Sequence, residues 1–394
     1  MSGSKYLGWC LSLTFFLVAV AAAINYVADP CGIYHYGKRW DWIHSRPAIL
    51  GVAFIHKARA VEQAQADVLF LGSSRTAEGL DPHNPVVPGR AYNLGLPDSS
   101  VYEQWRYFQH ACAAHMPNTV VLGIDMGGFA ATRKNNAMFL EDRLLVRPDG
   151  TPTPFLSRTF ADLGPTIFSL STVELSLKTL EVQRGPALKF DEGFEANAPL
   201  ITEHLDLAKS VFAANNKWVT NATTILYRGP DGGTPQMDAF DHLVAFCAEK
   251  HIRLIVFLQP LHSAALDNFT REWDAYADWE KALVTRMESH PGLQGEFWDF
   301  ASYNSMSTEP FPLPTDKYSH MRYYWEGSHY RKIVGDMVLE RIFTGAGPAA
   351  FGRQINSSTV DQDLQRLLDE KLAWHEHHQA VAIDISTAEV QANP

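Results

Sequence analysis

The sequence predicts an α/β fold with a mostly parallel sheet, because short apolar runs alternate with amphipathic helical stretches along the chain. The apolar runs, each bounded by turn residues, lie at 66–71, 119–124, 252–258 and, more weakly, 295–300. Such continuous runs are typical of strands that are covered on both faces. The helical stretches that precede the last three runs lie at 100–115, 237–250 and 273–288. This alternation favours parallel strands joined by right-handed crossovers.

The first element is an apolar segment, because residues 6–28 carry no charged side chain. At about 1.5 Å per residue, a helix of this length crosses a hydrocarbon core of about 30 Å. A cleaved signal peptide is the competing interpretation, since Ala21, Ala22 and Ala23 are small enough for a processing site. The run exceeds the roughly 7–15 residues of a signal peptide's apolar region, which favours a retained transmembrane anchor over residues 1–28. We expect the rest of the chain to be carried across the membrane.

The remaining elements divide the chain around the predicted sheet. The expected segments are a connector at 29–60, a sheet domain at 61–345 with an insertion or cap at 132–235, and a linker with a C-terminal helix at 346–394. The insertion contains one helix-like stretch, 166–183, between proline-, glycine- and polar-rich segments. Small residues over 345–358 are typical of a linker, and an amphipathic helix is expected from Thr359 to about His378.

The composition excludes several classes of function. The 394 residues include 33 Lys and Arg against 44 Asp and Glu, so the bulk positive charge expected of a nucleic-acid-binding protein is missing. A hydrophobic content of 46% is too high for a disordered chain. The four cysteines show no CxxC or Cys/His spacing, so neither a disulfide scaffold nor a structural zinc site is expected. We predict no metal and no other cofactor.

Polar and small residues follow the predicted strands, at the edge where open parallel sheets bind their ligands. The first strand runs into Gly72, Ser73, Ser74 and Arg75, a turn that would expose a hydroxyl group at the start of a helix. The other predicted strand ends are Asn93-Leu94-Gly95 and Gly123-Ile124-Asp125. A glycine at such an end lets a backbone N–H approach a substrate closely.

The strongest chemical signal is the pair Glu326 and His329, just before an apolar helical pattern at 333–342. A carboxylate three residues before a histidine can accept from one imidazole nitrogen while the other nitrogen faces a serine. This arrangement activates a hydroxyl group that is otherwise too weakly acidic to attack an acyl group. The serine, histidine and carboxylate would be distant in sequence and adjacent in space.

These segments together resemble the SGNH (GDSL-like) superfamily of hydrolases and acyltransferases, over roughly residues 60–345. Within it they are most similar to the membrane-anchored branch that includes DltD-like and alginate O-acetyltransferase-like proteins. The matching motifs are VLFLGSSRT at 68–76, YNLG at 92–95, VVLGID at 120–125 and YWEGSHYRKIVGD at 324–336. The resemblance implies a three-layer flavodoxin-like catalytic domain. It implies Ser74 as the nucleophile, His329 as general base and then acid, and the backbone N–H groups of Gly95 and Ser74 as oxyanion donors.

The sequence departs from the family pattern at two positions. The acid before the histidine is usually aspartate and is Glu326 in this chain, so a longer side chain must orient the imidazole. The third motif normally supplies an asparagine, whereas an ionised Asp125 cannot donate a hydrogen bond. Asp125 could instead orient Arg75, and Asn93 could replace the missing donor.

Several alternatives remain open from the sequence. Ser73 is the alternative nucleophile, and Asp299 and Asp316 are alternative acids. His262 follows a predicted strand and could line the pocket. Arg75 could bind an anionic group or form an ion pair with Asp125 or Glu78. The cluster at 375–378 (His-Glu-His-His) is interpreted as a solvated helix face and not as a metal site.

The function implied by the resemblance is O-acylation of an envelope or exported polysaccharide through an acyl-serine intermediate. The implied location is the bacterial inner membrane, with a single span and the catalytic domain on the periplasmic or extracytoplasmic side. An integral-membrane acyltransferase would be the partner that supplies the acyl donor. The alternatives are an anchored esterase or deacetylase that uses water, and a non-catalytic assembly or carbohydrate-binding subunit. A polyanionic acceptor would need local cations such as Arg75, Arg322 and Arg331, because the whole chain is acidic.

Overall fold

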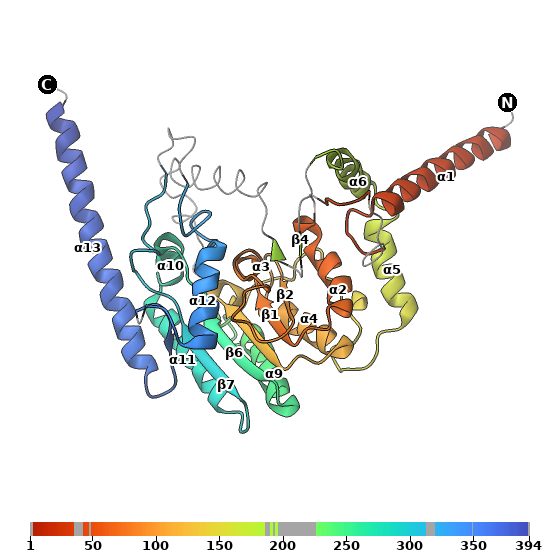
Figure 1. Ribbon diagram of the computed structural model, residues 1–394. Helices are drawn as coiled ribbons and strands as arrows, with labels where there is room; N and C mark the ends of the chain where they lie inside the picture. Colours follow the sequence, from red (N-terminus) through yellow and green to blue (C-terminus); the bar gives the residue numbers. More distant parts are fainter. Residues whose placement is uncertain are drawn as a thin grey trace.

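The computed structural model describes residues 3–34, 42–46, 49–185, 190–191, 194–195, 226–312, 320–348 and 350–392. Within these residues the chain is α/β, with a six-stranded, mostly parallel sheet and an apolar N-terminal helix (Figure 1). The alternation of apolar runs and helical stretches therefore predicted the fold class correctly. The rest of the predicted insertion, at 186–189, 192–193 and 196–225, lies outside the described residues.

The sheet has the strand order β2-β1-β3-β6-β7-β8. Its strands are β1 (Val68–Gly72), β2 (Ala91–Gly95), β3 (Thr119–Ile124), β6 (Arg253–Leu258), β7 (Gly295–Asp299) and β8 (Arg353–Gln354). The first five run parallel to one another, and β8 pairs antiparallel with β7. Gly72 lies opposite Gly95, so the carboxyl ends of β1 and β2 stand level at one edge. A separate antiparallel pair joins β4 (Phe190–Asp191) to β5 (Phe194–Glu195).

The helices include three that follow the sequence prediction within about two residues, namely α4, α9 and α11. The α-helices are α1 (Gly3–Ala28), α2 (Ala53–Ala64), α3 (Ser74–Gly79), α4 (Val101–Ala114), α5 (Phe155–Thr166), α6 (Leu170–Val182), α9 (Pro235–Lys250), α10 (Ser263–Phe269), α11 (Trp273–Glu288), α12 (Lys332–Thr344) and α13 (Val360–Ala392). The start of α4 shows a local cause. Ser100 caps the helix by accepting from the backbone of Glu103, whose carboxylate accepts from the Ser100 backbone in return.

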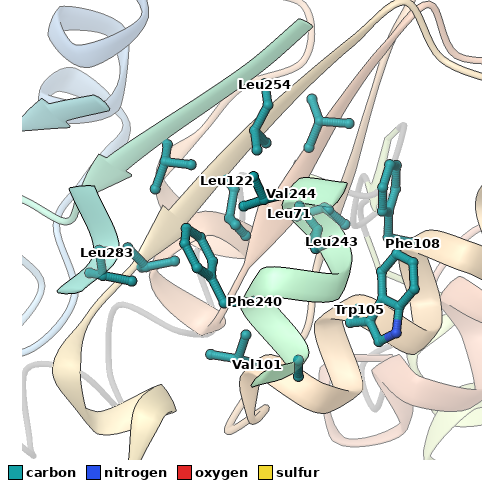
Figure 2. Close-up of a cluster of buried hydrophobic side chains, with 14 of the residues drawn as sticks. Leu71, Val101, Trp105, Phe108, Leu122, Phe240, Leu243, Val244, Leu254 and Leu283 are labelled. Atoms are coloured by element: carbon teal, nitrogen blue, oxygen red, sulfur yellow. The ribbon is translucent and has the colours of Figure 1, made fainter. Parts of the chain in front are cut away.

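Both faces of the sheet are covered, which explains why its strands are apolar without interruption. Leu69 and Leu71 pack into one cluster with side chains of α4, α9 and α11, part of which is shown in Figure 2. Val68 and Phe70, which point the other way, pack with side chains of α12. Burial of one such side chain contributes about 1.5–3 kcal/mol, so the two clusters dominate the stability of the domain.

The domain extends beyond the expected bounds of 61–345 at both ends. Helix α2, whose first eight residues fall in the expected connector, places Phe54 and Ala58 in the core. The expected linker contains β8 and the buried apolar side chains of Phe351 and Ile355. The first turns of α13 add Leu364 and Leu367 to the core. The sequence did not predict that the linker segment belongs to the core. Its few apolar residues are scattered among glycine and serine, and a strand of two residues has too little periodicity to be recognised.

The insertion also differs from its prediction. The single helix expected at 166–183 is preceded by a second helix, α5, and the two are separated at Ile167 and Ser169. Pro165 near the end of α5 lacks a backbone donor, which favours a break at this point. The polar faces of both helices pack inward, so their apolar pattern does not mark the buried side.

Helix α1 is long and apolar enough to cross a membrane, by its length and composition. A signal sequence near an N-terminus would pass the same test. The side chains over most of α1 are exposed, and contact with the rest of the chain begins near its end, at Asn25 and Ala28. Figure 1 shows α1 projecting away from the sheet domain, with α5 and α6 gathered at its C-terminal end.

Candidate active site

The predicted nucleophile lies on a tight turn between β1 and α3. Gly72 has a φ of +148°, and a Cβ atom at this position would lie 2.1 Å from Oγ1 of Thr76 and 2.7 Å from the carbonyl oxygen of Gly123. Only glycine permits so close an approach. The turn makes Ser73 the residue before α3 and places Ser74 in its first turn.

Ser74, His329 and Glu326 form one chain of contacts, although the serine is 255 residues away from the histidine in sequence. Nε2 of His329 lies 2.7 Å from Oγ of Ser74. Nδ1 of His329 contacts Oε1 of Glu326 on the other side of the ring. Because a carboxylate only accepts, Nδ1 carries the proton and Nε2 is free to accept from the serine hydroxyl.

This geometry shows which of the two adjacent serines, Ser73 or Ser74, faces the histidine. Oγ of Ser73 is buried and has no hydrogen-bond partner among the described residues. The histidine contacts Ser74 and not Ser73. Of the two alternatives left open by the sequence, Ser74 is the one that the imidazole contacts.

The longer Glu326 side chain is accommodated by the loop that carries it. The backbone N–H of Ser328 donates to Oε2 at 2.6 Å, and the backbone N–H of His329 donates to Oε1 at 3.0 Å. Tyr324 and Tyr330 pair across the base of the loop, and the backbone N–H of Trp325 donates to the carbonyl of His329. The carboxylate is therefore fixed on three sides before α12 begins at Lys332.

A second carboxylate, Glu78, lies beside the imidazole and was not singled out as a site residue from the sequence. Its Oε1 is 3.8 Å from Nε2 of His329, and its side chain is 7% exposed. Burial lowers the pKa of His329, but the charges of Glu78 and Glu326 outweigh burial and raise the pKa above its ordinary value. The signal that could have identified Glu78 is its position four residues after Ser74, one helical turn along the same helix face.

Arg75 forms an ion pair with Asp125, which is one of the two roles that the sequence predicted for it. Its Nη1 lies 2.6 Å from Oδ2 of Asp125. Its Nε and Nη2 donate to the carbonyl and the hydroxyl of Ser328, at 2.9 and 2.6 Å. Arg75 thereby joins α3 to the end of β3 and to the loop of His329, and Asp125 orients it.

Asn93 and Gly95 brace the fold, contrary to the expectation that they contribute oxyanion donors. The backbone N–H of Gly95 donates to Oδ1 of Asn93 at 2.9 Å, so it is already engaged. The amide of Asn93 donates to the carbonyls of Thr76 and Leu80, at 2.7 and 2.8 Å. These bonds hold α3 against β2. The sequence could not show this, since it depends on how α3 packs.

A cavity of about 380 Å³ opens beside Ser74. Ser73, Ser74, Arg75, Asp125 and Ser328 line one part of it, and neither Asn93 nor Gly95 does. Its apolar wall consists of Val101, Ile124, Phe129 and Phe269. Its remaining polar wall includes Asp98, Gln104 and Arg133, of which Asp98 and Arg133 form an ion pair. The cavity combines a hydroxyl group that contacts an imidazole, a fixed positive charge and an apolar wall.

Three buried side chains connect the elements that carry the triad, and none was predicted from the sequence. Oγ1 of Thr76 accepts from the amide of Gln259 at 2.9 Å, and the Gln259 carbonyl accepts from the Tyr330 hydroxyl at 2.8 Å. The Tyr330 ring packs so closely on Gly79 that a Cβ there would lie 1.9 Å from it. The serine helix and the histidine loop are therefore held at a fixed separation.

The remaining candidates that the structure describes do not join the site. Both ring nitrogens of His262 contact backbone groups, the carbonyl of Glu309 and the N–H of Ala264. His375 of α13 contacts Asp267 of α10 at 2.6 Å. Asp316 and the side chain of His378 lie outside the described residues. Asp299 belongs to a different cluster.

That cluster consists of Glu280, Asp299 and Asp363, whose carboxylate oxygens lie within 4.8 Å of one another. This spacing could hold a cation. The guanidinium of Arg366 already contacts Asp299 at 3.1 Å and Asp363 at 3.0 Å. Burial, with the nearby charge of Asp363, raises the pKa of Glu280 to about 8, so this carboxyl is protonated at neutral pH. The guanidinium of Arg366 already offsets part of the negative charge of this cluster, and we assign no metal to it.

We expect this cluster to make stability fall as the pH rises from about 5 to 8. The unfolded Glu280 carboxyl ionises near its ordinary pKa of 4.5, whereas the buried one keeps its proton up to about 8. In this pH range the folded state therefore binds more protons than the unfolded state does. The resulting contribution to the free energy of unfolding decreases as the pH rises and is lost when the buried carboxyl ionises. One pKa unit corresponds to about 1.4 kcal/mol, so the decrease is on the order of a few kcal/mol. Urea unfolding of the detergent-solubilised chain at pH 5.5 and 8.5 measures it, and Glu280→Gln should flatten the dependence. Equal slopes for both proteins would contradict the assignment.

No family model matches the chain, and no curated protein matches it.

Proposed function

We propose that this chain is an SGNH-type serine O-acyltransferase that acts through an acyl-serine intermediate. The observation that carries the proposal is the contact chain from Ser74, which lines a cavity, through His329 to Glu326. Glu78 and Arg75 add charges to the same place. A serine, a histidine of fixed tautomer and a buried carboxylate are the parts that nucleophilic acyl transfer needs.

The sheet supports the superfamily assignment. Numbered along the chain, the five parallel strands have the order 2-1-3-4-5, which is the flavodoxin-like order. Apolar clusters on both faces fit a three-layer arrangement. The site lies where this fold type is expected to bind ligands, beyond the carboxyl ends of β1 and β3.

In the first half-reaction, the Ser74 hydroxyl would attack the carbonyl carbon of an acyl ester while His329 Nε2 takes the hydroxyl proton. The carboxylate of Glu326 stabilises the imidazolium that forms. The tetrahedral intermediate then collapses as the imidazolium gives its proton to the departing alkoxide. The products of this step are the acyl-serine ester and the free alcohol.

In the second half-reaction, His329 would deprotonate a sugar hydroxyl, which attacks the acyl-serine carbonyl. Collapse of the second tetrahedral intermediate releases the acylated sugar and returns the proton to Ser74. With the Gly95 N–H engaged by Asn93, the remaining predicted oxyanion donor is the Ser74 backbone N–H. The guanidinium of Arg75 contributes a fixed positive charge on the same cavity wall.

We propose the bacterial inner membrane as the location, with α1 as a single span and the catalytic domain on the extracytoplasmic side. The length and composition of α1 support this. Acyl donors are made in the cytoplasm, so an integral-membrane acyltransferase partner would supply the acyl group across the bilayer. The proposed acceptor is an envelope or exported polysaccharide.

Transfer and hydrolysis are distinguished by the acceptor. The detergent-solubilised full-length chain is first treated with a fluorophosphonate, which should label the wild type and not a Ser74→Ala variant. Cleavage of p-nitrophenyl acetate is then followed in water and with added acetyl-free oligosaccharide. Faster nitrophenol release together with acetylated oligosaccharide supports a transferase. Hydrolysis that ignores the oligosaccharide indicates an esterase, and absent labelling indicates a non-catalytic subunit.

We predict that Glu78 sets the acidic limit of this activity. General-base catalysis needs neutral His329, so a raised pKa means that kcat/KM is fully present only above this pKa and is lost as the pH falls. Glu78→Gln removes a charge 3.8 Å from Nε2 and should move the acidic limb of the pH profile to lower pH. Asp336→Asn, which alters a surface pair with Lys332, is the matched control and should leave the profile in place. An unchanged limb in Glu78→Gln would exclude this role.

A charge reversal tests whether the acceptor is anionic. Arg322 is exposed on the segment that leads to His329, and its guanidinium lies 5.2 Å from the ring centre of Tyr323. Arg322→Glu should reduce acetyl transfer to an anionic oligosaccharide by about tenfold or more through lost attraction. Hydrolysis of neutral p-nitrophenyl acetate should change little. Equal losses in both reactions would indicate a structural effect.

A further inference from the structure

Large apolar side chains are exposed on one part of the molecule outside α1. Among the side chains that the structure describes, seven large apolar ones outside α1 are more than half exposed, and six of them lie between residues 155 and 177. The six are Phe155, Leu156, Phe160, Phe168, Leu170 and Leu177. They belong to α5, α6 and the short connection between these helices. A concentration of this kind on a water-soluble surface would be costly, and it indicates a partner.

Helix α6 has the polarity opposite to that of an ordinary surface helix. Its buried residues are Thr172, Ser176 and Thr179, so the side that faces the protein is polar. Leu170 and Leu177 face outward one above the other, and Leu170 is 80% exposed. In water the apolar stripe should be buried and the hydroxyl groups exposed. Lipid outside the helix removes this contradiction.

A second stripe of α6 remains polar and runs beside the apolar one. Glu174 and Lys178 lie on it and form an exposed ion pair at 2.8 Å. Helix α6 therefore presents a protein-facing side, an apolar outward stripe and a charged outward stripe. Helices that lie in the plane of a membrane surface show this division, with the apolar stripe in the acyl chains and the charged stripe in the headgroups.

This surface is continuous with α1. Asn25, which is 1% exposed, accepts from the hydroxyl of Ser176 at 2.9 Å and donates to the carbonyls of Ile167 and Ser169 at 3.0 and 3.1 Å. Hydrogen bonds through serine and asparagine between helices are typical of packing inside membranes. Figure 1 shows α5 and α6 at the C-terminal end of α1, where a spanning helix would leave the bilayer.

We propose that α5 and α6 form a second membrane contact, with their apolar stripes inserted into the lipid at the base of α1. The occupant of this surface is the bilayer itself. The proposal rests on α1 crossing that bilayer, and it does not depend on the catalytic activity proposed above.

The contact would fix the orientation of the sheet domain on the membrane. Asp162 of α5 is buried and pairs with Arg59 of α2 at 2.5 Å and with Arg143 at 3.0 Å. Lys57, also on α2, is fully buried and donates to the carbonyl of Gly95 at 2.7 Å. Contacts through α2 thus connect α5 to the sheet edge that carries Ser74. The domain would not swing freely on α1 as on a flexible tether.

Depth-dependent quenching in the full-length chain tests the proposal. A nitrobenzoxadiazole dye is attached to single cysteines in a Cys10→Ser background, because Cys31, Cys112 and Cys247 are buried. The two variants Leu177→Cys and Lys178→Cys place the dye at adjacent residues on the two outward stripes. Each is reconstituted alone into phosphatidylcholine vesicles that contain a lipid with a shallow doxyl quencher. Circular dichroism in detergent verifies that each variant is folded as the wild type is.

We expect the dye at residue 177 to be quenched at least about twofold more than the dye at residue 178. The native Cys10, exposed on α1, provides the internal control, since its dye should be quenched by a deep doxyl lipid. If Cys10 is quenched while residue 177 is not, the surface does not enter lipid and the proposal is wrong. Equal quenching at 177 and 178 would contradict the stripe geometry. An unquenched Cys10 would remove the premise that α1 is inserted, and the proposal with it.

Discussion

Replacing Ser74 by alanine is expected to lower kcat/KM for acetyl-ester cleavage by at least about 10³-fold, whereas replacing Ser73 should change it by less than about tenfold. The reason is that Ser74 alone of the two presents its oxygen to His329, at 2.7 Å. Without that oxygen no acyl-enzyme forms, and what remains is binding and electrostatic stabilisation of direct attack by water. Initial rates with p-nitrophenyl acetate over a range of concentrations measure both variants.

Comparing Ser73→Ala with Ser74→Ala also tests which of the two serines is the nucleophile, because Ser73→Ala serves as the structural control. Ser73 precedes α3 and has a buried hydroxyl group without a partner, so its removal costs little folding energy. A Ser73→Ala variant that loses as much activity as Ser74→Ala, with an unchanged unfolding temperature, would refute Ser74 as the sole nucleophile. The double variant should behave as Ser74→Ala does.

Replacing Glu326 by glutamine is expected to lower kcat by about 10³- to 10⁴-fold, with little change in KM. The amide has no charge to stabilise the imidazolium, and its NH₂ group cannot accept the Nδ1 proton. If that group faces the ring, Nδ1 must accept and the proton moves to Nε2, where His329 can no longer take a proton from Ser74. The two backbone N–H groups that Glu326 accepts from limit how the amide can turn.

Glu326→Asp serves as the conservative control. It keeps the charge and shortens the side chain by one methylene, in a loop whose geometry is set by the Tyr324 and Tyr330 pairing. We expect activity between that of the wild type and that of Glu326→Gln. A Glu326→Gln variant with wild-type kcat would show that the charge of Glu326 is not needed. The imidazolium would then be stabilised by Glu78, at 3.8 Å from Nε2, or by solvent.

The fold class and the residues that meet at Ser74 were accessible from the sequence because their signals are local. Buried strands require uninterrupted apolar residues, and the turn after β1 requires Gly72, so both leave a recognisable pattern. The pair Glu326 and His329 was recognisable because the two residues are three apart in one loop. The strand β8 and helix α5 were missed, since one is two residues long and the other buries its polar side.

What the sequence by itself determined is therefore the alternation of the main strands and helices of the sheet, the apolar N-terminal helix and the residue types available for acyl chemistry. Only the tertiary structure decided how those residues are used. It brought Ser74 and not Ser73 against His329, turned Asn93 and Gly95 into braces of α3, and brought Glu78 to the imidazole. The physical reason is that a side chain's role depends on the direction in which packing holds it. Such directions arise from contacts such as Gly79 with Tyr330, between residues more than 200 positions apart.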